Sequence, residues 1–172
     1  DQDVLDDPDI RKLLIILKAI QKFGEGKELI ELLFIDIFGI SPLDIYKLSS
    51  YNRGGLGLYD IIRSPEIMKE AGIQEVEKLH ALFQTLSTWK KQSRSKNAVA
   101  ALEDIIRDSG LLSHMISDPL AAEKMEKLGV FFEQVKGLVT AYKDYTLEDF
   151  FEYLDVLKAH NISIKGKGLS YT

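Results

Sequence analysis

The pair Glu77 and His80 is the first candidate for chemistry, because it has the Glu-x-x-His spacing of carboxylate di-metal sites. Residues three apart on a helix share a face, so one metal ion could bridge both side chains. Such sites need a second copy of the motif on another helix, but His114 and His160 have no glutamate three residues before them. We therefore favour chance spacing of two surface residues and expect no metal site.

Motifs of hydrolytic and nucleotide-binding sites are missing from the sequence. There is no H-E-x-x-H, no G-x-S-x-G and no G-x-x-x-x-G-K-[ST]. Residues 166–168 (Gly-Lys-Gly) lack the earlier glycine and the Ser or Thr that would contact magnesium. Residues 54–57 precede a predicted helix and could offer N–H groups to a phosphate, but no obvious strand comes before them. A turn is the better interpretation, and we expect no catalysis and no cofactor in this chain.

A cationic segment with no acidic neighbour is the stronger signal. Lys90, Lys91, Arg94 and Lys96 place four positive charges in seven residues, and no Asp or Glu occurs within residues 78–102. Mobile cationic donors without a nearby carboxylate suit contact with a phosphate backbone. We expect a polar connector between two helices here. The alternative, a solvated loop with no ligand, is the one that composition alone favours.

Length and composition indicate one soluble globular domain. The chain has 172 residues, 45% hydrophobic and 28% charged, with a net charge of -5 and no cysteine. The negative charge gives no sign of bulk nucleic-acid binding, so any such contact needs a local basic patch. No apolar run approaches the roughly 18 residues of a membrane span, and no signal peptide is present. We expect a cytoplasmic protein without a membrane partner. Because the chain starts at Asp1 and not Met, we also expect a fragment of a longer protein.

The dominant hydrophobic period is helical. The first example is the set Ile10, Leu13, Leu14, Leu17 and Ile20. We therefore predict an all-α orthogonal bundle of seven to nine helices, with short strands near residues 162–164 and 169–171. The apolar arc of the first helix covers about half its circumference, which is wide for a helix covered on one side. We expect this helix to pack between two neighbours, one of them outside the chain.

Cap residues mark several helix starts. Asp7 precedes a proline at the first helical position, and Asn97 precedes an apolar periodic segment. Ser41 is predicted to cap a helix with Asp44 at the capping-box spacing, and Thr146 begins a similar box. No repeat and no clear linker divides the chain, so residues 1–172 are predicted to form a single domain.

Five segments, taken in order, resemble a known family. They are residues 9–14 (Asp-Ile-Arg-Lys-Leu-Leu), 38–44 (Phe-Gly-Ile-Ser-Pro-Leu-Asp), 106–111 (Ile-Arg-Asp-Ser-Gly-Leu), 128–135 and 146–154. Each is similar to a stretch of the 2B accessory domain of UvrD/PcrA/Rep-like superfamily 1 DNA helicases. The individual patterns are diffuse, and their order and spacing make the resemblance.

The resemblance implies an all-helical insertion in the second RecA-like motor domain of an ATP-dependent helicase. In that family the motor domains bind ATP and Mg²⁺ and move 3′ to 5′ on single-stranded DNA. The 2B domain meets double-stranded DNA ahead of the fork and swivels to regulate unwinding. This chain would then be non-catalytic, with its own motor domains and the fork duplex as partners. Residues 1–24 and 161–172 would lie at the junction with the motor domain.

Two duplex-contact sites follow as expectations. The first is Gly39, Ile40 and Ser41, which resembles the family's Gly-Ile-Gly turn with serine in place of the last glycine. Its N–H groups would lie at a helix start, which favours phosphate. The second is the cationic segment, Lys90, Lys91, Arg94 and Lys96. The alternative function is a helical protein-interaction module that makes no nucleic-acid contact and binds a partner helix through its wide apolar face.

Overall fold

The computed structural model describes residues 2–51, 53–165 and 168–171. Within them the helices are α1 (Pro8–Gln21), α2 (Gly26–Leu33), α3 (Pro42–Ser50), α4 (Leu58–Ile62), α5 (Pro65–Glu70), α6 (Val76–Ser95), α7 (Ala98–Asp108), α8 (Leu111–Ile116), α9 (Ala121–Ala141) and α10 (Leu147–Ala159). Two 3₁₀ turns, η1 (Val4–Asp6) and η2 (Asp36–Phe38), and two strands, β1 (Ile162–Lys165) and β2 (Gly168–Tyr171), complete the described chain.

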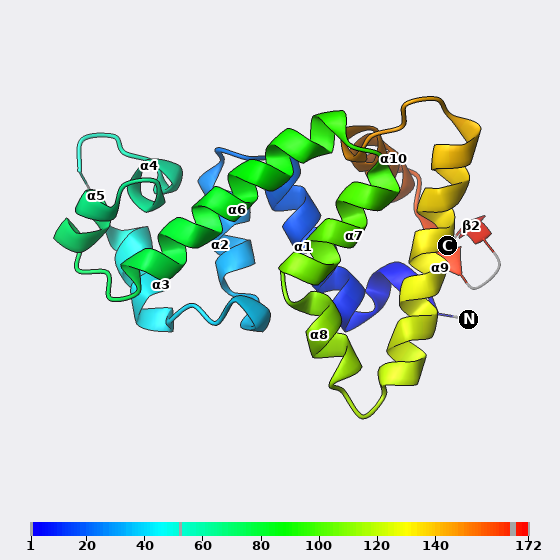
Figure 1. Cartoon of the computed structure of the whole chain (residues 1–172), viewed down its shortest axis with the longest axis horizontal. Coiled ribbons are helices and arrows are strands. Elements are labelled where there is room, and N and C mark those ends of the chain that lie inside the picture. The colour runs from blue at the N-terminus through cyan, green and yellow to red at the C-terminus, as the bar shows by residue number, and fades with distance from the viewer. Residues whose placement is uncertain (1, 52, 166–167, 172) are drawn as a thin grey trace.

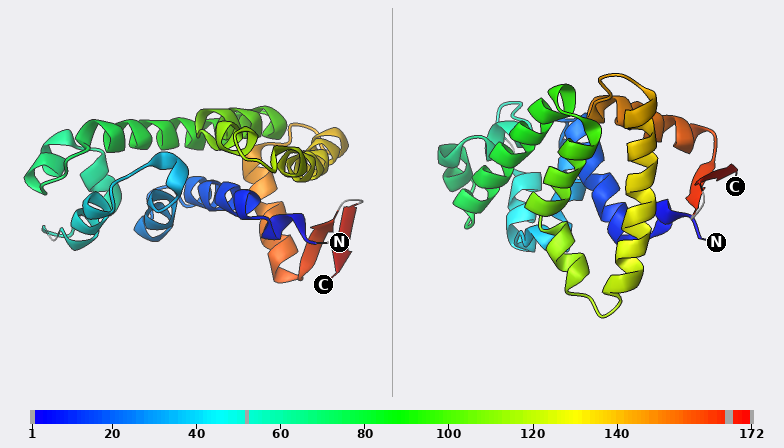
Figure 2. Two further views of the ribbon diagram at one scale, coloured as in Figure 1. Left: turned by 90° about the horizontal axis from the view of Figure 1, so that it is seen from below. Right: turned by 45° about the vertical axis from the view of Figure 1, so that its right-hand side comes forward.

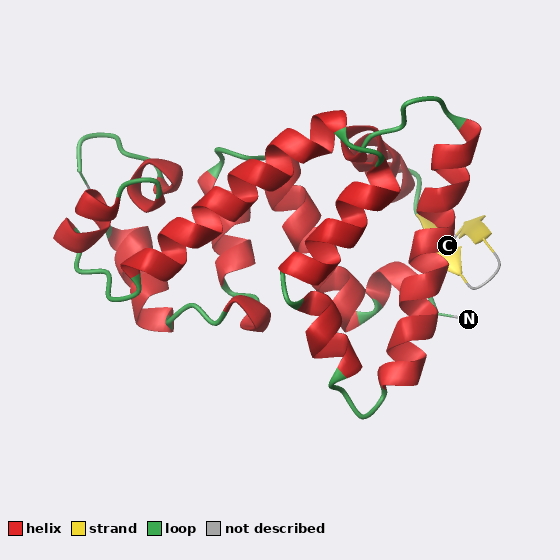
Figure 3. Ribbon diagram, viewed as in Figure 1, coloured by secondary structure: helices red, strands yellow, loops and turns green. Residues whose placement is uncertain are grey.

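The predicted all-helical class is confirmed, and the short strands lie where the sequence indicates (Figure 3). The described residues hold ten α-helices, one more than the upper limit of the prediction. The helices that the sequence did not predict are short, since α5 and α8 have six residues each. A segment of one or two turns is too short to show a helical period clearly.

Helix α6 runs across the molecule and contacts helices on both sides (Figure 1). It packs against α4 and α5 at its N-terminal end, and against α1, α7 and α10 further along. The views in Figure 2 show the same long helix lying over α1 and α2. Because one helix spans both groups, α6 fixes the distance between any sites placed at its two ends.

Helix α1 is the central element of the core. Its apolar arc is buried at Ile10, Leu13, Ile16, Leu17 and Ile20. Helices α2, α6, α8 and α10 and the turn η1 contact it. These elements cover most of the apolar arc and leave Leu14 and Ile15 partly exposed, so a further neighbour outside the chain stays a prediction.

Three of the four predicted helix caps are confirmed. The Asp7 carboxylate accepts two backbone N–H groups at 3.0 and 3.1 Å, and the Asn97 side chain accepts two at 2.9 and 3.3 Å. Thr146 and Asp149 form the reciprocal capping box that begins α10. The prediction for Ser41 is wrong, since its side chain makes no cap hydrogen bond.

Segments from opposite ends of the sequence lie side by side at one end of the molecule (Figure 2). Strand β1 pairs antiparallel with β2 and also contacts η1. The backbone N–H of Ile164 donates to Asp3 Oδ1 at 3.0 Å, which joins residues 161 apart in the chain. Residues 166 and 167, part of the Gly-Lys-Gly stretch, lie outside the described residues. In the part of the chain that is described, no helix is long and apolar enough to cross a membrane.

Candidate nucleic-acid interface

The turn at Gly39 and Ile40 joins η2 to α3. Gly39 has a positive φ of 58°, and its N–H donates to Asp36 O at 3.0 Å. Such a backbone conformation favours glycine because it lacks a Cβ. Ile40 is only 8% exposed and belongs to the hydrophobic core. The turn is thus anchored on the protein at Ile40, and the Gly39 N–H already has an acceptor.

The start of α3 is joined to the start of α6 by a reciprocal pair of carboxylates. Asp44, 1% exposed, accepts the backbone N–H groups of Gln74 and Glu75, each at 3.0 Å. In return, Glu75 Oε1 accepts the backbone N–H of Ser41 at 2.9 Å. Asp44 therefore does not cap Ser41 as predicted: its oxygens accept from the segment before α6, and the Ser41 N–H donates to Glu75.

These hydrogen bonds change the expected chemistry of the turn. The sequence predicts unpaired backbone donors for a phosphate, but the N–H groups of Gly39 and Ser41 both have internal acceptors. For these two groups the prediction is wrong, because the Asp36 carbonyl accepts the Gly39 N–H and the Glu75 carboxylate accepts the Ser41 N–H. Duplex contact by Gly39, Ile40 and Ser41 stays a prediction.

Lys78 places a positive charge directly against this turn. Its Nζ donates to Gly39 O at 2.7 Å and lies 3.4 Å from Glu75 Oε2, while its side chain is 47% exposed. A Cβ at Gly39 would lie 3.1 Å from the same Nζ. Lys78 is not among the predicted site residues, because its local signal is only a lysine three residues after a glutamate. Its partner in the turn is Gly39, which is 39 residues away in the sequence and so gives no local signal.

The cationic segment is helical, which corrects the predicted connector. Helix α6 continues to Ser95, so only the residues after it link α6 to α7. The reason lies on the opposite face of the same turns, where Leu86, Trp89 and Ser93 are buried. Their spacing of three and four residues is that of a helix packed on a core, and it carries the helix past the polar residues.

Three of the four cations of this segment have internal partners. Lys90 Nζ donates to Gln21 O, at the end of α1, at 3.1 Å. Arg94 Nε lies 3.4 Å from Glu148 Oε2, and Lys96 forms an ion pair with Asp104. The Lys91 side chain is exposed and has no ion pair or hydrogen bond identified among the described residues. Burial, together with the neighbouring Arg94, lowers the pKa of Lys90.

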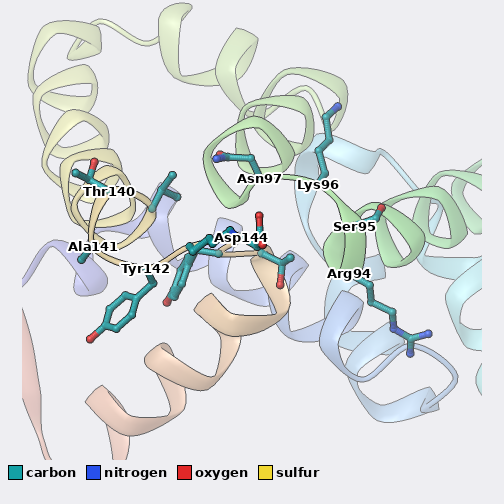
Figure 4. A pocket seen from close by; sticks show the side chains of 12 residues that line it. Arg94, Ser95, Lys96, Asn97, Thr140, Ala141, Tyr142 and Asp144 are labelled. Atoms are coloured by element: carbon teal, nitrogen blue, oxygen red, sulfur yellow. The ribbon is translucent and has the colours of Figure 1, made fainter.

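An open pocket of about 730 Å³ lies beside this end of α6 (Figure 4). Arg94 and Lys96 line it from one side, and residues 139–146 line it from the other. In Figure 4 the side chains of Arg94 and Lys96 point in different directions. The ring of Tyr142 is exposed and stacks on Tyr145 with 5.9 Å between centroids. Arg94 and Lys96 therefore do not converge on a single point where one anion could bind both of them.

The two predicted sites lie at opposite ends of one helix. Lys78, at the Gly39 turn, and Lys90 are twelve residues apart on α6, which corresponds to about 18 Å of helix at 1.5 Å per residue. At 3.6 residues per turn the same twelve residues rotate the side chain by about 120° beyond three full turns. The two sets of predicted residues therefore form separate sites at a fixed distance along α6.

The remaining candidates have local structural partners. His80 Nδ1 lies 3.3 Å from Ile62 O, and its ring stacks on Phe83. No group of three His, Asp or Glu side chains in the described ranges could hold a metal ion. At the glycine-rich loop, Gly57 N–H donates to Asp60 Oδ2 at 2.9 Å, so this donor at the start of α4 is occupied.

Comparison with family models, curated proteins and solved structures finds no match to this chain.

Proposed function

We propose that this chain is the helical accessory domain of an ATP-dependent 3′–5′ DNA helicase similar to UvrD, PcrA and Rep. In this role it contacts the duplex ahead of the fork and regulates unwinding. The order of the five resembling segments supports the proposal, as does the all-helical fold. The segment 38–44, which resembles the family's turn and following helix, runs from the last residue of η2 through a turn into the start of α3.

The observation that carries the proposal is the contact between Asp3 and Ile164. A domain inserted in another domain must receive the chain and return it at neighbouring points. The hydrogen bond of 3.0 Å between these residues, and the packing of η1 on β1, provide that arrangement. The two segments belong to residues 1–24 and 161–172, which the resemblance assigns to the junction with the motor domain.

In this proposal the motor domains hydrolyse ATP, and this domain contacts the duplex. ATP and Mg²⁺ would bind between the RecA-like motors, in the cytoplasm. The residues of this chain would contribute phosphate contacts at two places on α6, near Lys78 and near Lys91. An interaction module that acts through the first helix has less support, because the chain itself covers most of the apolar arc of α1.

The proposal is tested in the full-length protein that carries this sequence. Residues 4–164 are replaced by a short Gly/Ser linker, and ATP hydrolysis and strand separation are measured on a forked DNA. We expect ATP hydrolysis that still depends on single-stranded DNA, with a changed rate of unwinding. The proposal fails if the unaltered protein shows no ATP hydrolysis stimulated by single-stranded DNA, or if removal of the domain leaves unwinding unchanged.

A further inference from the structure

We propose that Lys78 is the residue through which the Gly39 turn holds a backbone phosphate of duplex DNA. This inference rests on the proposed function and adds a charged contact residue to it. The turn itself offers little else, since the N–H groups of Gly39 and Ser41 have internal acceptors and Ile40 is buried. A cation that touches the turn and remains exposed is the group best able to meet a phosphate there.

The geometry of the ammonium leaves it ready for a further acceptor. A lysine ammonium has three N–H donors. Two acceptors of Lys78 are identified, Gly39 O at 2.7 Å and Glu75 Oε2 at 3.4 Å. With the side chain 47% exposed, a phosphate oxygen can reach the third donor without any change in the backbone.

Gly39 has a second role in this account. Its positive φ favours glycine, and its missing Cβ leaves room for the Lys78 ammonium, which would lie 3.1 Å from an added Cβ. A larger residue would push the ammonium away from the turn. Gly39 thus positions the charge that makes the contact.

Glu75 opposes the phosphate at the same ammonium. Its Oε2 is an anionic acceptor of Lys78, while its Oε1 holds the Ser41 N–H. A phosphate that binds Lys78 must compete with this carboxylate. Removing the negative charge of Glu75 while keeping an oxygen acceptor should therefore strengthen the phosphate contact.

The main test compares Lys78→Gln with Lys78→Arg and with the control Lys69→Gln in the full-length protein. Lys69 is an exposed lysine of the neighbouring helix α5 without an ion pair among the described residues. Glutamine keeps a donor for Gly39 O but removes the charge. Affinity for blunt duplex DNA is measured by fluorescence anisotropy across a salt series. We expect Lys78→Gln to weaken binding several-fold at low salt and to reduce the slope of log K against log salt by about 0.9, as loss of one phosphate contact requires.

The arginine variant should retain both the affinity and the slope, whereas the Lys69 control should leave the slope unchanged. The variants Glu75→Gln and Glu77→Gln each remove one negative charge, but only Glu75 competes with a phosphate for the Lys78 ammonium. We therefore expect Glu75→Gln to raise duplex affinity more than Glu77→Gln. Equal slopes for Lys78→Gln and the unaltered protein would overturn the assignment of Lys78. If the unaltered protein unwinds no DNA with ATP, the proposed function fails instead, so the two failures are distinguishable.

Discussion

The Asp44 carboxylate accepts the backbone N–H of Glu75 at 3.0 Å, and the Glu75 carboxylate accepts the N–H of Ser41, three residues before Asp44. Each acid thus caps the segment that carries the other. This exchange holds the start of α3 against the start of α6, and it makes the Gly39 turn a fixed part of the surface. A fixed turn presents Lys78 in one place, which is what a phosphate contact needs.

Replacing Asp44 by Ala should reduce the free energy of unfolding by about 1–3 kcal/mol, because two N–H groups lose their acceptor beside a buried site. Asp44→Asn keeps one oxygen acceptor and should cost less. Chemical denaturation of the 172-residue chain measures both. The exposed Asp108→Ala serves as the control, and its effect should stay within about 0.5 kcal/mol. An equal loss in the free energy of unfolding for Asp44→Ala and the control would show that the Asp44 hydrogen bonds do not stabilise the fold.

Local signals in the sequence were enough to place several helix starts. Asp7 and Asn97 cap helices as predicted, because a capping side chain accepts from N–H groups two or three residues ahead. The box at Thr146 succeeds for the same reason. Asp44 has the right spacing for Ser41, but its oxygens accept from a segment 30 residues later, which spacing cannot reveal.

The candidate site was harder to predict than the fold, because its contacts are distant in sequence. Lys78 gains its place from Gly39, and Lys90 gains a partner from Gln21 at the end of α1. The polar composition around Lys90 indicated a loop, yet the buried Trp89 and Ser93 extend the helix. Tertiary burial of one face outweighed the polarity of the other.

Variants of Lys90 and Lys91 should distinguish a lysine that stabilises the fold from a lysine that contacts DNA. Lys90→Ala should lower the free energy of unfolding by about 1 kcal/mol, since it removes a hydrogen bond to the end of α1. Lys91→Ala should change stability by less than about 0.5 kcal/mol but reduce the salt slope of duplex binding by about 0.9. Unfolding of the chain and anisotropy of the full-length protein give the two values. A Lys91 variant with an unchanged slope would remove this end of α6 from the interface.

The Asp104 carboxylate should contribute to stability in a defined pH range. Its hydrogen bond with Lys96, and a second with Arg107, hold its pKa below the usual 3.8. Because the folded-state pKa is lowered, the stabilisation is fully present above the unfolded-state pKa and is lost as pH falls through the folded-state value.

Unfolding of the unaltered chain and of Asp104→Asn should therefore differ at pH 7, and the difference should shrink below about pH 4. Denaturant midpoints collected from pH 7 to pH 2 provide the measurement. A difference that stays constant over this range would show that the Asp104 charge plays no part in stability.

Unwinding by the full-length protein with Gly39→Leu, compared with Gly54→Leu, shows whether the Gly39 turn and Lys78 together contact the duplex. Both glycines have a positive φ, 58° and 52°, so both substitutions carry a similar backbone cost of about 1–2 kcal/mol. Only Gly39 lies against Lys78, whereas a Cβ at Gly54 meets nothing within 4 Å. We predict that Gly39→Leu weakens duplex binding and unwinding while ATP hydrolysis stimulated by single-stranded DNA stays largely intact, and that Gly54→Leu changes neither. Unwinding by Gly39→Leu at the rate of the unaltered protein across a salt series would contradict the account.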